Sequence, residues 1–134
     1  MGFTATTGTV GITGLGRTQT IIFDKVITNV GGGYHNHTGI FTAPVSGVYV
    51  FSFDLLVSPG EYEHFDIVQD GKYITTGLAH ATGGSVYDSM SRTVVLRCSQ
   101  GSEVWVRIGG GTHGTGKIYG GDYTSFSGWL VAIV

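Results

Sequence analysis

The sequence has little cysteine, little proline and little charge. Its 134 residues include one cysteine and two prolines, and Asp, Glu, Lys and Arg together make up 12%. A single cysteine excludes an intrachain disulfide, and a chain of about 130 residues needs none, because folding buries roughly two-thirds of its surface. We therefore expect a single domain over residues 1–134 with one core. Cys98 alternates in phase with Val94 and Leu96, which predicts a small buried side chain.

The scarcity of charge also argues against several classes of protein. A net charge of −2 and a pI of about 6.1 disfavour a nucleic-acid binder, which carries a basic patch, and 41% hydrophobic residues argue against disorder. No run of about 18 apolar residues is present, so we expect neither a membrane-spanning helix nor membrane insertion. The start, Met1-Gly2-Phe3-Thr4, lacks the basic residues and the apolar stretch of a signal peptide. A cytosolic protein would begin in this way, and so would the excised domain of a secreted protein. So little charge predicts that part of the surface is covered, most simply in an oligomer.

Motifs of the common catalytic sites are missing as well. The sequence contains no Gly-x-Ser-x-Gly elbow, no His-Glu-x-x-His pair and no phosphate-binding loop. Its acids show no spacing that marks a catalytic pair, among them Asp54, Glu61, Glu63, Asp66, Asp88 and Asp122. We therefore expect that the protein is not an enzyme.

Helix signals are nearly absent, whereas turn signals are frequent. The chain has 24 glycines, and β-branched and aromatic residues cluster in short runs between them, which is typical of an all-β sandwich or barrel. About ten strands are expected, and that number in two antiparallel sheets describes a jelly roll. The predicted strands cover residues 3–7, 19–28, 34–37, 39–42, 47–57, 64–69, 72–81, 87–98, 103–108 and 125–134.

Alternation along the strands predicts which side chains are buried. Strand 125–134 is apolar on both faces, so we expect it in the centre of a sheet, with its second face against another sheet or subunit. Asp70-Gly71 predicts a type I′ hairpin turn. The glycine-rich segment 8–14 predicts a flexible loop, and the glycine-rich segment 109–116 predicts a mobile loop. Strands 19–28 and 47–57 should bury Ile21, Phe23, Val26, Tyr49, Phe51, Phe53, Leu55 and Val57.

Three segments of the chain together form a family pattern. The first runs from Phe23-Asp24-Lys25-Val26 through Asn29, Tyr34 and Thr38-Gly39-Ile40-Phe41 to the turn at Pro44 and Gly47. The second combines Val95-Leu96 with Gly101-Ser102-Glu103-Val104-Trp105-Val106, and the third is Phe126-Ser127-Gly128-Trp129-Leu130. From Phe3 to Leu130 the chain resembles the complement C1q globular-head family, although Ser102 replaces the usual aspartate.

The resemblance implies a ten-stranded jelly roll that assembles as a homotrimer, as in the tumour-necrosis-factor superfamily. It also implies that Phe23 and Val26 pack inward and that the protein is secreted. Many family members carry a collagen stalk, which this chain lacks, so the chain resembles a head-only member or an excised head.

The expected function is extracellular recognition. One form is a lectin-like, pattern-recognition head that binds microbial or host glycans in innate immunity. Alternatives are a secreted ligand or adaptor that binds a protein receptor, and a structural trimerisation domain. The fold motifs themselves leave the ligand open.

The candidate ligand site is the glycine-rich region from Gly109 to Asp122 and its flank. Aromatic rings can stack on sugar faces, while charged and imidazole groups can hydrogen-bond hydroxyls or carboxylates. Exposed loops often carry such functions. The alternative is an ordinary solvated loop with Tyr123 packed on its own sheet. The candidate binding residues are His113, Lys117, Tyr119, Asp122 and Tyr123.

A calcium site is a further expectation from the resemblance. Many family trimers hold calcium near the three-fold axis with acids that precede the leucine strand, and Asp88 matches one of them. The second acid is missing from the segment Gly77–Thr82. Because calcium takes about six to eight oxygen ligands, we expect weak or absent binding, with Asp88 as the only side-chain ligand and no certain cofactor.

Residues 35–38 hold two weaker signals. His35 and His37 would point the same way on a strand and could form a metal pair, but a structural zinc site needs about four ligands. Asn36-His37-Thr38 is a glycosylation sequon. Asn36 would carry a glycan if it is exposed in a secreted eukaryotic protein, although such tripeptides also occur by chance.

Overall fold

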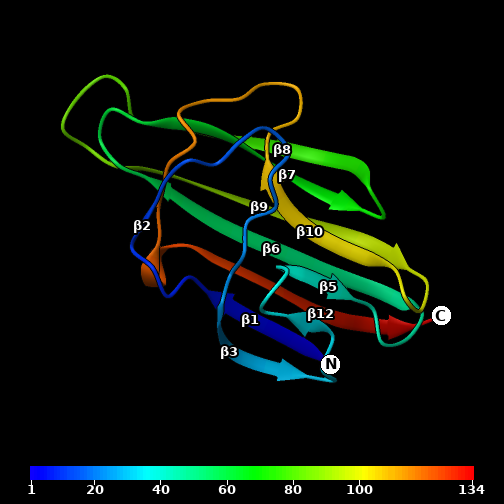
Figure 1. Cartoon of the computed structure of the whole chain (residues 1–134). Coiled ribbons are helices and arrows are strands. Elements are labelled where there is room, and N and C mark those ends of the chain that lie inside the picture. The colour runs from blue at the N-terminus through cyan, green and yellow to red at the C-terminus, as the bar shows by residue number, and fades with distance from the viewer.

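Two antiparallel β-sheets face each other in the computed structural model, which describes residues 1–134 (Figure 1). The seven-stranded sheet contains, in order, β9 (Asp88–Cys98), β6 (Gly47–Val57), β12 (Ser125–Ile133), β1 (Gly2–Thr6) and β3 (Lys25–Val30), with β11 (Ile118–Tyr119) and β2 (Gly11–Ile12) beside the end of β6. The five-stranded sheet has the order β4 (Tyr34–His35), β5 (Ile40–Thr42), β10 (Glu103–Ile108), β7 (Tyr62–Gln69) and β8 (Lys72–His80). The one helical element is a 3₁₀ turn, η1 (Gly121–Tyr123).

The all-β jelly roll expected from the sequence is confirmed. All ten predicted strands have a counterpart, and the two extra ones, β2 and β11, have two residues each. β12 lies between β6 and β1 in the larger sheet, as its two apolar faces predicted. Asp70 and Gly71 have φ values of 51° and 80°, as a type I′ turn requires. The structure contains no helix with the length and apolar character of a membrane span.

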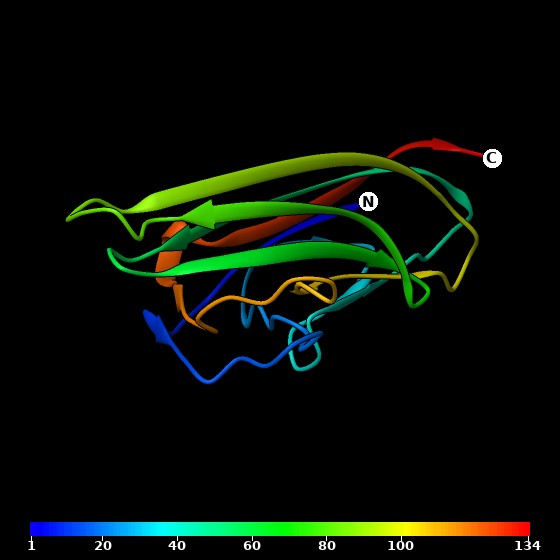
Figure 2. The ribbon, with the colours of Figure 1, turned by 90° about the horizontal axis from the view of Figure 1, so that it is seen from above.

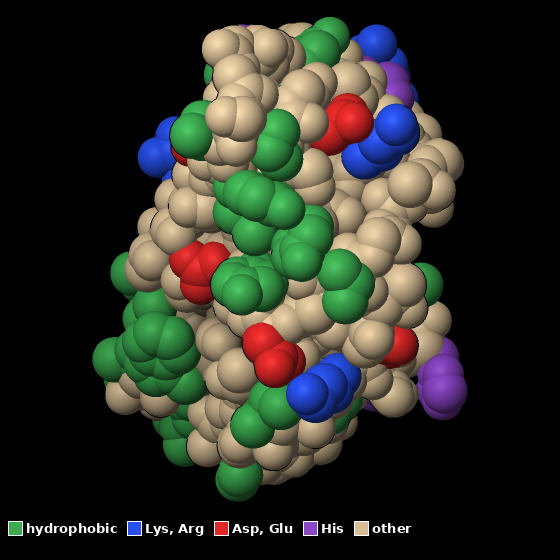
Figure 3. Space-filling model, turned by 90° about the vertical axis from the view of Figure 1, so that its left-hand side faces the viewer, with side chains coloured by type: hydrophobic (Ala, Val, Ile, Leu, Met, Phe, Trp, Pro, Cys, Tyr) green, Lys and Arg blue, Asp and Glu red, His purple; other side chains and the backbone are tan.

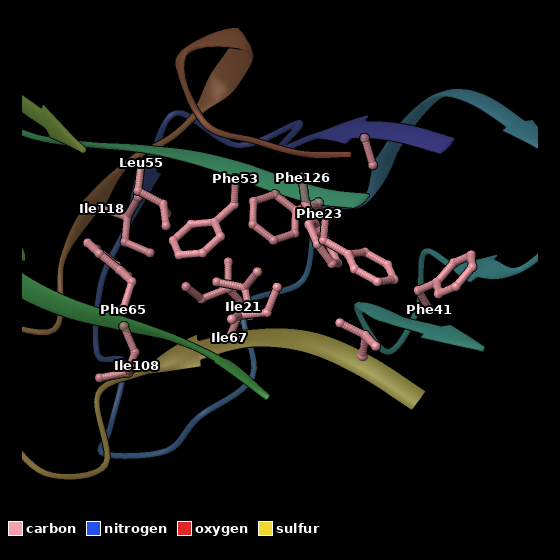
Figure 4. Packing of buried hydrophobic residues seen from close by; sticks show 14 of the residues in the cluster. Ile21, Phe23, Phe41, Phe53, Leu55, Phe65, Ile67, Ile108, Ile118 and Phe126 are labelled. Atoms are coloured by element: carbon pink, nitrogen blue, oxygen red, sulfur yellow. The ribbon is translucent and has the colours of Figure 1, made fainter. Parts of the chain in front are cut away.

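The core lies between the two sheets. Figure 2 shows the layers from above, with β6, β9 and β12 in one and β7 and β10 in the other. Every inward-facing side chain predicted for β6 is fully buried, and the partner sheet packs against them (Figure 4). Figure 4 places Phe53 and Leu55 opposite Phe65 and Ile67 of β7. Cys98 is also buried, as predicted, and this burial, together with the nearby Asp70 carboxylate, raises the pKa of its thiol to about 11.

Tyr34 links several polar groups of the segment from Phe23 to Phe41 by hydrogen bonds. The Tyr34 hydroxyl donates to the Phe23 carbonyl at 2.6 Å and accepts from the Phe23 N–H at 3.2 Å. The Asn29 side chain bonds both the N–H and the carbonyl of Tyr34. Burial raises the pKa of the Tyr34 hydroxyl, so it stays a hydrogen-bond donor. These bonds hold Phe23, which lies outside the strands, in the core beside Tyr34.

The segment 19–28 differs from its prediction. The strand begins only at Lys25, yet Ile21 and Phe23 are 2% and 0% exposed. The Ile21 N–H donates to the Val106 carbonyl, so this stretch packs through isolated bonds to β10. The expected inward packing of Val26 is wrong, since Val26 is 38% exposed. It lies on edge strand β3, which pairs only with β1 and with a register shift.

Candidate functional site

Three tyrosines meet at the end of the sandwich opposite the chain termini. β6 ends between two strands, because Leu56 is paired with Ser89 of β9 on one side and with Tyr119 of β11 on the other. The ring of Tyr87 therefore lies edge-to-face with Tyr119 at 5.3 Å between centroids, and Tyr123 of η1 lies 5.6 Å from Tyr119. Figure 3 shows side chains of the hydrophobic class, in which tyrosine is included, gathered in the middle of this end, with charged side chains around them. We call these three residues the tyrosine row.

A cleft of about 370 Å³ lies beside the tyrosine row and is lined by Tyr119, Tyr123, Asp122 and Lys25. The Lys25 Nζ lies 3.2 Å from the Asp122 Oδ1, and these side chains are 52% and 77% exposed. An ion pair this exposed contributes little stability, so both groups can exchange their partner for a ligand. The N–H of Gly121 donates to Thr9 and Thr7 oxygens and fixes the backbone of η1. We call this hollow the tyrosine cleft.

The structure brings together three of the five predicted ligand residues. Tyr119, Asp122 and Tyr123 line the tyrosine cleft, whereas Lys117 and His113 point elsewhere. The Lys117 Nζ lies 3.5 Å from Oε1 of Glu61. Neither Tyr87 nor Lys25 was expected from the sequence, because Tyr87, directly before β9, and Lys25, on β3, lie far along the chain from residues 109–123.

The glycine-rich loop, residues 109–116, is held by buried carboxylates. Glu63 is fully buried and accepts hydrogen bonds from the N–H groups of Gly114 at 2.6 Å and Gly116 at 2.8 Å. The His113 Nδ1 lies 3.2 Å from Oε2 of Glu63, without hydrogen-bond geometry. Asp66 binds the N–H of Gly110 in the same way at 2.9 Å. The loop that the sequence predicted to be mobile is therefore tied to β7 at both ends, because the acids that lacked a visible partner in the sequence bind its backbone.

Asp88 does not sit in a metal cluster. Its Oδ2 accepts a hydrogen bond from the His80 N–H at 2.8 Å, and no group of three or more His, Cys, Asp or Glu side chains could hold a metal ion. Calcium takes about six to eight oxygen ligands. The residues of a single chain therefore do not fit a calcium site, and a site at Asp88 shared with other copies of the chain stays a prediction.

The histidine pair does not have the geometry expected of it. β4 ends at His35, and the N–H groups of Thr38 and Gly39 turn back to the His35 carbonyl. The strand alternation that would align His35 with His37 is therefore absent. The Asn36 Nδ2 donates to the Asp24 carbonyl at 3.3 Å, and glycosylation of Asn36 stays a prediction.

Comparison with known proteins agrees with this architecture. The sequence model of the C1q domain matches residues 3–131. Mouse complement C1q tumor necrosis factor-related protein 3 is 34% identical over 113 residues, which cover 83% of this chain but only 44% of the relative. This chain thus spans less than half the length of that relative.

Solved structures support the same fold. The globular domain of zebrafish complement 1qA protein matches with a TM-score of 0.77 and 18% identity, over 99% of this chain and 98% of the other. The tumour necrosis factor Eiger from S. frugiperda matches with a TM-score of 0.75 and 10% identity, over 100% of this chain and 94% of the other. These two likenesses concern the fold, and the sequence match adds the family. The chain belongs to the C1q domain family.

Proposed function

We propose that this protein is a non-enzymatic extracellular recognition head that binds glycans in its tyrosine cleft. The observation that carries the proposal is the tyrosine row beside Asp122 and Lys25. Exposed aromatic rings offer flat apolar faces to a pyranose, and a carboxylate with an ammonium group can bond its hydroxyls. Microbial and host glycans are the expected ligands, in keeping with a role in innate immunity.

The proposed active form is a homotrimer. On the outer face of the larger sheet, Val50 of β6 is paired with Trp129 of β12 and with Val95 of β9. Trp129, Val95 and Val131 are 45%, 65% and 58% exposed. Covering such an apolar row with a second copy removes it from water, at about 25 cal/mol per Å². Three tyrosine clefts on one trimer would convert weak single-site binding into avidity.

The test is binding of the purified protein to arrayed glycans and microbial wall components, with calcium and with chelator. Tyr119→Ala and Asp122→Ala should abolish competable binding, because they remove a stacking face and the exposed acceptor. Lys117→Ala is the matched control, since this side chain pairs with Glu61 and does not line the tyrosine cleft. Unchanged binding by both cleft variants would refute the assignment.

A second candidate is a secreted ligand that binds a protein receptor. It is favoured by the 34% identity to a C1q tumor necrosis factor-related protein. Competition with soluble sugars separates the two functions, because a partner that survives both sugar competition and deglycosylation is recognised as protein. If neither glycan nor protein binds, a structural trimerisation role is left.

A further inference from the structure

A second cleft of about 360 Å³ lies at the smaller sheet. It is formed by β7, β8, β10 and the start of the glycine-rich loop, and it shares no residue with the tyrosine cleft. Most of its lining is polar, with a single tyrosine ring as the apolar part. Its lining residues are His64, Asp66, Tyr73, Thr76, Arg107, Gly111 and Thr112.

Arg107 is fixed in this cleft by Asp66. The Arg107 Nε donates to the Asp66 Oδ2 at 3.1 Å, and the same oxygen accepts from the Gly110 N–H at 2.9 Å. The Asp66 side chain is 3% exposed, whereas that of Arg107 is 18% exposed. The carboxylate is thus neutralised and covered, while both Nη groups of Arg107 have no acceptor in the chain. A guanidinium bound only through Nε presents its terminal fork to a ligand.

His64 adds a second unused polar group to the same cleft. Its Nδ1 is buried and has no hydrogen-bond partner in the chain. A buried polar atom without a partner costs free energy, which a ligand can recover. In the Nδ1-protonated tautomer it donates, so the cleft then offers donors from two side chains.

We propose that this cleft binds a carboxylate. The Nη fork of Arg107 matches the two oxygens of a carboxylate, His64 supplies a further donor, and the Tyr73 ring, 53% exposed, packs on the adjoining apolar part of the ligand. A singly charged group fits better than a phosphate dianion, because Asp66 already offsets the one permanent positive charge in the cleft. This site is independent of the tyrosine cleft and of glycan binding there.

The probes are acetate, glucuronate, glucose and inorganic phosphate, each titrated into the ¹⁵N-labelled protein and followed by NMR. Both carboxylates should shift the backbone amides of His64 and of residues 110–112 in a saturable way, and glucose should not. If glucuronate binds more tightly than acetate, the ligand of this cleft is an acidic sugar. If the two bind equally well, the cleft recognises the carboxylate group alone. No response, an equal response to glucose, or tighter binding of phosphate would overturn the proposal.

Variants separate recognition from folding. Arg107→Lys keeps a positive charge beside Asp66 but loses the planar fork, so acetate should bind roughly tenfold more weakly. Arg17→Lys is the matched control, because Arg17 donates to the carbonyls of Gly110 and Gly111 from outside the cleft. The affinity of this variant for acetate should equal that of the wild type.

The exposed ring provides a variant that does not depend on the buried ion pair. Tyr73→Ala should weaken glucuronate and leave acetate unchanged, and its melting temperature should match that of the wild type. If Arg107→Lys fails to fold, His64→Phe takes its place, again with weaker acetate binding expected. Wild-type affinity in a folded Arg107→Lys or His64→Phe variant contradicts the assignment.

Discussion

Replacement of Glu63 by glutamine should release the glycine-rich loop and destabilise the whole domain. Glu63 is fully buried, and its two oxygens accept from the N–H groups of His64, Gly114 and Gly116. A glutamine amide keeps only one oxygen. In its best orientation the carbonyl keeps the bonds to His64 and Gly114, and the amide NH₂ then opposes the N–H of Gly116, donor against donor.

The expected magnitude follows from those bonds. A hydrogen bond to a charged group contributes about 1.5–3 kcal/mol, and the change also leaves a buried donor unsatisfied. Because the groups share one network, the contributions do not simply add. We expect a loss of about 3 kcal/mol in the free energy of unfolding, which lowers Tm by roughly 10 °C in a domain of this size.

Thermal and urea unfolding at one fixed protein concentration measure the stability, and hydrogen exchange measures the loop. The amides of Gly114 and Gly116 should lose protection in Glu63→Gln before those of β6 do. Glu61→Gln is the matched control, since it removes only the partly exposed ion pair to Lys117, worth less than about 1 kcal/mol. If Glu63→Gln melts like this control and the two glycine amides keep their protection, the carboxylate does not anchor the loop.

Three further changes test other parts of the structure. Gly39→Ala should cost about 3 kcal/mol in chemical denaturation, since φ is +78° there and a Cβ would lie 2.5 Å from the Ile21 carbonyl; wild-type stability would refute this. Val95→Glu should turn the proposed trimer into monomers in sedimentation without loss of fold, because that side chain is 65% exposed; an unchanged sedimentation coefficient would argue for another interface. The pKa of the Cys98 thiol is raised from 9.0 to about 11 in the folded state. Between these two pH values the folded protein keeps the thiol proton, whereas the unfolded chain loses it. Stability should therefore fall as pH rises from 9 to 11, and Cys98→Ala should lack this component.

Much of the fold is written locally in the sequence. The period-two alternation of β6 predicted its buried face, and Asp70-Gly71 predicted the turn between β7 and β8, because each signal depends on neighbouring residues only. The burial of Ile21 and Phe23 was also visible in the pattern. Their hydrogen-bond partners were not, since these lie on β10 and on the Tyr34 side chain.

The candidate sites show more clearly what the sequence alone does not predict. Composition and motifs determined the all-β class, the family and three members of the tyrosine cleft: Tyr119, Asp122 and Tyr123. Only the tertiary structure decided that Tyr87 packs edge-to-face on Tyr119 beside this cleft, because β9 and β11 flank the end of β6. It also decided that Glu63 and Asp66 bind the loop backbone. These contacts depend on how strands distant in the sequence pack together, so no local spacing of residues predicts them.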